Sequence, residues 1–171
     1  TEGDWSSDVC SSDLKGTFAM ISLGLLETNS IARGIIAGDA MLKAAEVTLL
    51  KAGAVCPGKY VVVIYGEVAA VSASMDAGKR YAAEYLVDDL TIASLDPQVV
   101  EAITGGCEPS VLSAMGVMEF YTISAAVVAA DLAAKAADVR LMEVRLGLGI
   151  GGKSYVTLSG EVAAVQSAID A

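Results

Sequence analysis

The sequence predicts an α+β fold made of two tandem copies of one unit, each ordered strand, helix, strand, strand, helix, strand. The first observation is an internal repeat: the stretch "GEVAAV" at residues 66–71 recurs letter for letter at residues 160–165. Earlier segments repeat at a constant offset of 92 residues, which becomes 94 after a two-residue insertion. The second observation is that β-prone runs alternate with alanine-rich segments of helical periodicity. Self-similarity of this kind marks a duplicated structural unit.

The first helix of the unit follows from its cap and its periodicity. Asn29 or Ser30 is suited to cap a helix that continues to residue 45. Ile31, Ile35 and Leu42 recur at helical spacing, so we expect them to form the buried face of this helix.

The strands and the second helix complete the unit. Residues 21–26, 47–50 and 60–65 are β-prone, and the last two runs are joined across a turn at Gly58. The second helix shows three apolar side chains at i, i+3 and i+7: Val68, Val71 and Met75. A final strand is expected near residues 90–93. The second copy reaches Ala171 at its second helix, so we expect this copy to be truncated at its C-terminus.

The domain boundaries follow from the repeat. Residues 1–16 are set aside as an artefactual or disordered tail, because residues 3–14 match the translation of a sequencing adapter. The alternative is a natural tail rich in Ser and Asp, which carries no function either. The first domain then covers residues 17–108 and the second, incomplete one residues 109–171.

Composition excludes several classes of function. The chain has 171 residues and a net charge of −10, which argues against nucleic acid as a partner. The longest uncharged apolar candidate, residues 120–130, is too short to span a membrane. Cys56 and Cys107 form no disulfide framework, and no signal peptide is visible, so a cytoplasmic location is predicted. The absence of histidine excludes Ser-His-Asp and Cys-His catalysis, and we expect no enzymatic activity.

One motif supports an alternative function. Residues 147–154 satisfy G-x-x-x-x-G-K-[ST], the phosphate loop of nucleotide-binding enzymes. That mechanism needs a helix beginning at Lys153-Ser154, so that its amides face the phosphates. The residues that follow, "YVTL", are β-prone instead, and so are those that follow the matching Gly58-Lys59. The pattern therefore predicts a turn between strands and no phosphate site.

The repeated residues resemble the bacterial microcompartment shell domain. The stretch "GLLETNSIARGIIAGDAMLKAAEVTLL" is similar to the opening strand and helix of that family, and "GEVAAVSASMDAG" to its second helix. The tandem arrangement, with "CPGKY" in one copy and "GIGGKSY" in the other, resembles the trimeric tandem type, which includes an iron–sulfur form in propanediol-utilisation compartments. One departure concerns "SLDP" at residues 94–97, where many relatives carry a Pro-Arg-Pro-His-like stretch. This departure puts the contacts at the edges of the assembly in doubt.

The resemblance implies a structural shell protein. Its expected partners are two further copies of itself in a pseudohexameric homotrimer, other shell proteins in a flat layer, and an encapsulated redox enzyme. The resemblance assigns the lining of a central pore to eight residues: Val55, Cys56, Pro57, Gly58, Gly149, Ile150, Gly151 and Gly152. It assigns Lys43 and Lys135 to the edges between neighbouring hexagons. On periodicity alone these lysines are solvated helix ends.

Cys56 is the expected metal ligand. On a threefold axis, one cysteine per chain becomes a three-thiolate site, and the resemblance implies one [4Fe-4S] cluster per trimer at this position. Pro57 stiffens the turn and Gly58 lets backbone approach closely. Ile150 replaces Cys56 in the second copy, so the expected ligation is threefold. A pore-lining thiol without metal is the alternative, and Cys107 is expected to be inert.

Overall fold

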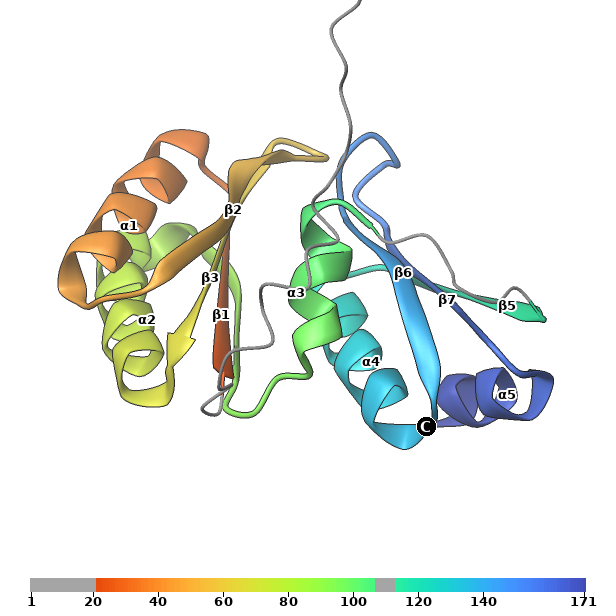
Figure 1. Cartoon of the computed structure of the whole chain (residues 1–171). Coiled ribbons are helices and arrows are strands. Elements are labelled where there is room, and N and C mark those ends of the chain that lie inside the picture. The colour runs from red at the N-terminus through yellow and green to blue at the C-terminus, as the bar shows by residue number, and fades with distance from the viewer. Residues whose placement is uncertain (1–20, 107–112) are drawn as a thin grey trace, which may run out of the picture.

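The chain folds into two α/β units that lie side by side. The structure, a computed structural model, describes residues 21–106 and 113–171. The predicted tail of residues 1–16 and Cys107 therefore lie outside the described residues. Figure 1 shows two sheets, each with its own pair of helices, and a shorter helix between the units.

The first unit has the predicted order of elements, with a short 3-10 helix added. Its bounds are β1 (Ile21–Thr28), α1 (Ile31–Ala44), β2 (Thr48–Val55), β3 (Lys59–Glu67), α2 (Val68–Ala82), η2 (Ala83–Tyr85) and β4 (Leu86–Ile92). The strands form an antiparallel sheet in the order β2-β3-β1-β4. The first unit therefore confirms the strand, helix, strand, strand, helix, strand prediction.

The second unit repeats five of these elements. They are β5 (Ala114–Phe120), α4 (Ile123–Ala136), β6 (Val139–Leu146), β7 (Ser154–Gly160) and α5 (Val162–Asp170). The sheet order is β5-β7-β6, which leaves β5 at an edge. Within residues 113–171 no strand corresponds to β4.

Equivalent side chains begin the first helix of each unit. Ser30 caps α1, and its hydroxyl accepts a hydrogen bond from the backbone N–H of Arg33 at 3.4 Å. Thr122 caps α4 in the same way, by accepting from the N–H of Ala125 at 3.2 Å. Each cap satisfies a backbone donor that would otherwise have no partner within the helix. Of the two cap residues considered from the sequence, the structure selects Ser30.

A helix between the units was not predicted. α3 (Pro97–Thr104) is capped by Asp96, whose carboxylate accepts a hydrogen bond from the N–H of Gln98 at 2.9 Å. Proline occupies the first position of the helix. It buries Val99 and Ile103 and packs against β6 and α4 of the second unit. α3 therefore follows the first unit in sequence but covers the second in space.

The two units share a hydrophobic core. Leu23 and Leu25 of β1 are fully buried in one cluster with Val127 of α4 and Val156 of β7. A smaller cluster, which includes Leu26 and Met41, fills the space between the first sheet and its own helices. Both faces of the first sheet are therefore covered, one of them by the second unit.

The predicted buried face of α1 is wrong for the single chain. Ile35 is 54% exposed, and Ile31 and Leu42 are exposed as well; α1 instead buries small residues and Met41. The counterpart of Ile35 in the second unit, Val127, is 0% exposed. The reason is that α4 lies against the sheet of the first unit, whereas among residues 21–106 and 113–171 no second sheet covers α1.

Candidate functional site: the paired hairpin turns

The two turns that the sequence assigns to a pore lie against each other. Figure 1 shows the β2–β3 turn and the β6–β7 turn at the same end of the molecule. The backbone N–H of Cys56 donates a hydrogen bond to the carbonyl of Gly147 at 3.1 Å. A Cβ placed on Gly147 would lie 3.4 Å from the Cβ of Val55. One chain therefore presents both predicted loops as a single surface.

The first turn is short and tight. The N–H of Gly58 donates to the carbonyl of Val55 at 3.0 Å, and the Cys56-Pro57 peptide bond is cis. Gly58 has φ +84°, a conformation that glycine adopts without steric cost. The side chain of Cys56 is half-buried. Hydrogen bonds from the N–H groups of Cys56 and Gly58 therefore hold the backbone of this turn.

The glycines of the second turn are explained by backbone conformation. Gly147, Gly149, Gly151 and Gly152 have φ values of +65°, +78°, +67° and +86°. Such values strain any residue with a side chain. The N–H of Lys153 donates to the carbonyl of Ile150 at 3.3 Å, and strand β7 then follows. With a strand in place of a helix, the alternative of a nucleotide-binding enzyme at residues 147–154 has no support.

The predicted pore residues face different surroundings. Val55 is buried at 4% exposure and belongs to the shared core. Gly58, Gly149 and Gly151 are open, because an added Cβ would meet no atom within 4 Å. Gly152 is packed, since its added Cβ would lie 2.9 Å from the carbonyl oxygen of Cys56. The lack of a side chain at Gly152 therefore lets the Cys56 backbone approach this closely.

The contrast between neighbouring glycines gives a matched prediction. Gly151→Ala should lower the free energy of unfolding by about 1 kcal/mol, because alanine is strained at positive φ. Gly152→Ala adds a clash with the Cys56 carbonyl, and we expect a loss of about 2–3 kcal/mol. Urea denaturation measures both values, and thiol labelling should show Cys56 more reactive in Gly152→Ala alone. Equal losses would mean that the Gly152 contact does not hold the turn.

The part of the chain that the structure describes brings only one cysteine, Cys56, to the paired turns. Among the described residues no three His, Cys, Asp or Glu side chains gather as a metal site. Cys56 is the free cysteine in this part of the chain. Since thiolates hold such clusters, the donor set fits only if several copies bring their Cys56 side chains together.

The two predicted edge lysines have different environments. Lys135 contacts Asp131 at 2.6 Å and donates to the carbonyl of Ser94, in the segment that leads from β4 to α3. Asp131 is buried and accepts a hydrogen bond from the N–H of Asp96 at 2.8 Å. Lys135 therefore lies at the junction of the two units. Lys43 contacts Asp39 at 2.7 Å and is exposed. Their role between hexagons stays a prediction.

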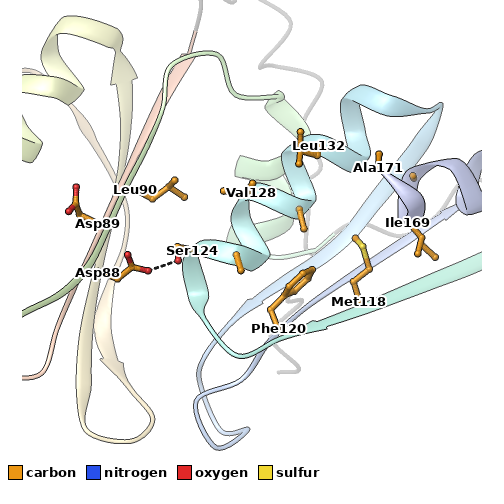
Figure 2. Close-up of a pocket in the computed structure, with 13 residues that line it drawn as sticks. Asp88, Asp89, Leu90, Met118, Phe120, Ser124, Val128, Leu132, Ile169 and Ala171 are labelled. Atoms are coloured by element: carbon orange, nitrogen blue, oxygen red, sulfur yellow. Dashed lines mark hydrogen bonds between the residues drawn. The ribbon is translucent and has the colours of Figure 1, made fainter.

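A cavity of about 540 Å³ lies between β4, α4, α5 and β5. Figure 2 shows Met118 and Phe120 on one side and Leu90 on the other, with Ser124 donating a hydrogen bond to Asp88. In the first unit β4 pairs with the corresponding edge of β1. The cavity thus lies beside the free edge of β5, whereas the equivalent edge of β1 is covered by β4. Its position therefore follows from the fold.

No helix among residues 21–106 and 113–171 combines the length and the apolar character needed to cross a membrane.

The repeated unit, the shared core and the paired turns define a tandem shell-domain protein. The family model described as BMC domain matches residues 22–95 and 114–171, and the chain belongs to this family. It is 40% identical over 148 residues to the bacterial microcompartment shell protein PduT of Citrobacter freundii, covering 86% of this chain and 80% of PduT.

Two further relatives extend the comparison. The crystal structure of a microcompartment protein from Desulfitobacterium hafniense DCB is 54% identical, with a TM-score of 0.86 over 90% of this chain and 85% of that one. The carboxysome shell protein CsoS1B of Halothiobacillus neapolitanus is 40% identical over 79 residues, covering 46% of this chain and 71% of CsoS1B. PduT and the Desulfitobacterium hafniense protein match a length that includes both units, and the carboxysome protein matches a length close to that of one unit.

Proposed function

We propose that the chain is a structural, non-catalytic subunit of a bacterial microcompartment shell, and that three copies form a pseudohexameric ring around a central pore. The observation that carries the proposal is that each unit has one exposed apolar surface. These two surfaces correspond, by the repeat, to the two surfaces that pack together at the junction inside the chain. The similarity to named shell proteins supports the same role.

The contact inside the chain supplies the template. Ile123 and Val127 of α4 are buried in the core that they share with Leu23 and Leu25 of β1. A helix of the second unit therefore packs against the sheet of the first unit. Burial of these apolar side chains stabilises the junction.

The counterparts of both surfaces are open. Ile31 and Ile35, on the helix of the first unit, are 45% and 54% exposed. Met115 and Val117, which match Leu23 and Leu25 on the sheet of the second unit, are 58% and 52% exposed. Soluble proteins seldom leave matched apolar faces uncovered. The exposed helix face of one copy would pack against the exposed sheet face of the next copy. Such head-to-tail contacts close into a ring.

A buried ion pair repeats the same asymmetry. Lys59 and Glu27 of the first unit lie 2.9 Å apart, and the Glu27 side chain is 4% exposed. The matching pair, Lys153 and Glu119, lies 3.4 Å apart, and Glu119 is 67% exposed. The second unit therefore has an open charged site where the first has a covered one. Coverage of β5 by a neighbouring copy would make the two units alike.

The ring would give Cys56 its function. Three copies would place three thiols around the pore, and a [4Fe-4S] cluster bound there would supply one-electron transfer across the shell. Ile150 of the second unit offers no thiolate, so three ligands are available. An encapsulated redox enzyme would then be the electron partner, and other shell proteins would extend the layer. The second candidate is a metal-free pore for small solutes, favoured by the lack of a second cysteine beside Cys56 among the described residues.

Anaerobic reconstitution with iron and sulfide tests both levels of the proposal. Light scattering should show a trimer, and iron analysis should give about four iron atoms per three chains. Cys56→Ala should lose the iron but remain a trimer, because apolar packing holds the ring. Cys107→Ala is the matched control and should change neither result.

The two levels fail separately. A stable monomer at micromolar concentration contradicts the ring. A trimer without iron, or with equal iron in Cys56→Ala, contradicts the cluster and favours the solute pore.

A further inference from the structure

A second cavity, of about 440 Å³, lies where α3 meets the ends of β6 and β7. Its lining is polar, unlike that of the cavity beside β5, and includes the side chains of Gln98, Asp138, Arg140, Ser159 and Glu161. We call it the polar cavity. Sites for small molecules have volumes of about 300–1,000 Å³, so the polar cavity has room for such a ligand.

The polar cavity is lined by a buried hydroxyl that lacks a partner. Ser159 is 1% exposed, and its hydroxyl makes no hydrogen bond among residues 21–106 and 113–171. Ser159 lies opposite Arg140 in the pairing of β7 with β6, and such cross-strand neighbours share one face of a sheet. Arg140 contacts Glu101 of α3 at 2.7 Å, so this is the face that α3 covers. The hydroxyl is therefore directed toward the cavity beside α3, and a ligand that pairs with it would remove the cost of burying it alone.

The interior of the polar cavity favours a neutral ligand. The Arg140 guanidinium carries a positive charge there, but Glu101 compensates it. The side-chain oxygen of Gln98 accepts a hydrogen bond from the N–H of Leu141 at 3.1 Å, so the amide of Gln98 can serve a ligand only as a donor. The buried group that lacks a partner, the Ser159 hydroxyl, is itself neutral. A bound charge would therefore have no counter-charge in the interior and would pay for its desolvation.

The rim of the polar cavity supplies acceptors. Asp138 and Glu161 are both exposed, and ionised carboxylates only accept hydrogen bonds. Glu161 uses one oxygen to accept from the hydroxyl of Ser113 at 2.9 Å, and a carboxylate has about four acceptor positions in all. These two charges repel anions. A hydroxyl group can donate to the rim and accept from the interior, so a molecule with several hydroxyls matches both.

The repeated fold does not require the polar cavity. Tyr65 corresponds to Ser159 at the offset of 94, and Thr48 corresponds to Arg140 at the offset of 92. Tyr65 and Thr48 lie opposite each other in the same way, and Tyr65 packs against the shared core. A tyrosine ring thus occupies the position where the second unit has a small serine. Tyr65 remains half-buried at the junction inside the chain, so the equivalent contact between copies would not by itself close the polar cavity.

We propose that the polar cavity binds a neutral polyhydroxyl molecule of about the size of a monosaccharide. The Ser159 hydroxyl and the Gln98 amide pair with the hydroxyls inside, and the two carboxylates accept from the hydroxyls at the rim. The site is complete within one chain and separate from Cys56. It therefore requires neither the ring nor the cluster.

Saturation-transfer NMR of the full chain with glucose, and separately with sorbitol, tests the proposal. We expect saturable binding of at least one of them with a dissociation constant below about 10 mM, a weak affinity on the usual scale. Tighter binding of glucose would identify a ring sugar, and tighter binding of sorbitol an open-chain polyol; each supports the site. Sodium acetate and methylammonium chloride, with sodium chloride holding the ionic strength constant, should displace neither. Displacement by either ion would overturn the assignment of a neutral ligand.

Substitutions in β7 locate the site. Ser159→Ala should lower the affinity about fivefold, the usual effect of one neutral hydrogen bond. Ser159→Tyr, which introduces the residue of the first unit, should fill the cavity and abolish binding. Ser154→Ala is the matched control, because the Ser154 hydroxyl is also buried and unpartnered among the described residues but does not line the cavity. It should bind as the parent chain does.

The outcomes separate this site from the proposed shell function. Cys56→Ala should bind glucose and sorbitol normally, so failure of the iron site and failure of the polar cavity are distinguishable. If Ser159→Tyr does not fold, Ser159→Ala still decides, because it only removes a hydroxyl. Absence of saturable binding below about 10 mM, or equal affinity in Ser159→Ala and Ser154→Ala, would overturn the proposal.

Discussion

Ile35→Asp should leave the chain folded but abolish its assembly, whereas Val127→Asp, at the repeated position, should prevent folding. Ile35 is 54% exposed in the single chain, so a carboxylate there remains hydrated. Val127 is fully buried, and an unpaired charge in the core costs more than about 4 kcal/mol, a large part of the stability of a typical domain. Circular dichroism melts and light scattering separate the two effects.

An exposed position on another helix supplies the control. Ala69→Asp, on the surface of α2, should fold and assemble as the parent chain does. If Ile35→Asp still forms trimers, the exposed face of α1 is not the contact between copies. If Val127→Asp keeps its cooperative melt, the core shared by the units is not what stabilises them.

Lys59→Met should destabilise the chain by about 3 kcal/mol. Lys59 is the ion-pair partner of Glu27 at 2.9 Å, and the Glu27 carboxylate is nearly inaccessible to water. Removal of the lysine leaves a buried negative charge without compensation, which costs more than the pair itself contributes. Thermal and urea unfolding should both show the loss at neutral pH.

The second unit again offers the matched control. Lys153→Met breaks the equivalent but exposed pair with Glu119, and we expect a change within about 1 kcal/mol. The double variant Glu27→Gln, Lys59→Met should recover much of the loss, because it leaves no unpaired charge. Equal effects of Lys59→Met and Lys153→Met would show that burial of Glu27 does not govern the pair.

Local patterns were sufficient to predict the elements of both units. The repeat fixed the order of strands and helices, because each is specified by nearby residues such as the cap Ser30 and the turn glycine Gly58. Helix α3 was missed although Asp96-Pro97 is a typical helix start, because this segment lies between the two copies and has no counterpart in the repeat. The buried face of α1 was wrong because periodicity identifies an apolar face but not the surface that covers it.

The site could be predicted only in part. The repeat placed Cys56 and Gly152 in equivalent turns, but the contact between these turns depends on how the units pack.

Because two units are fused in one chain, the contact between them does not depend on the protein concentration. In a ring of three such chains, every second junction lies inside a polypeptide, where the shared core forms without any loss of translational freedom. The effective concentration of one unit for the other is set by the tether and not by the amount of protein. Dilution would therefore separate the chains while the two units of each chain remained docked. Rebuilding the ring from three chains would take two encounters, whereas six separate domains would need five.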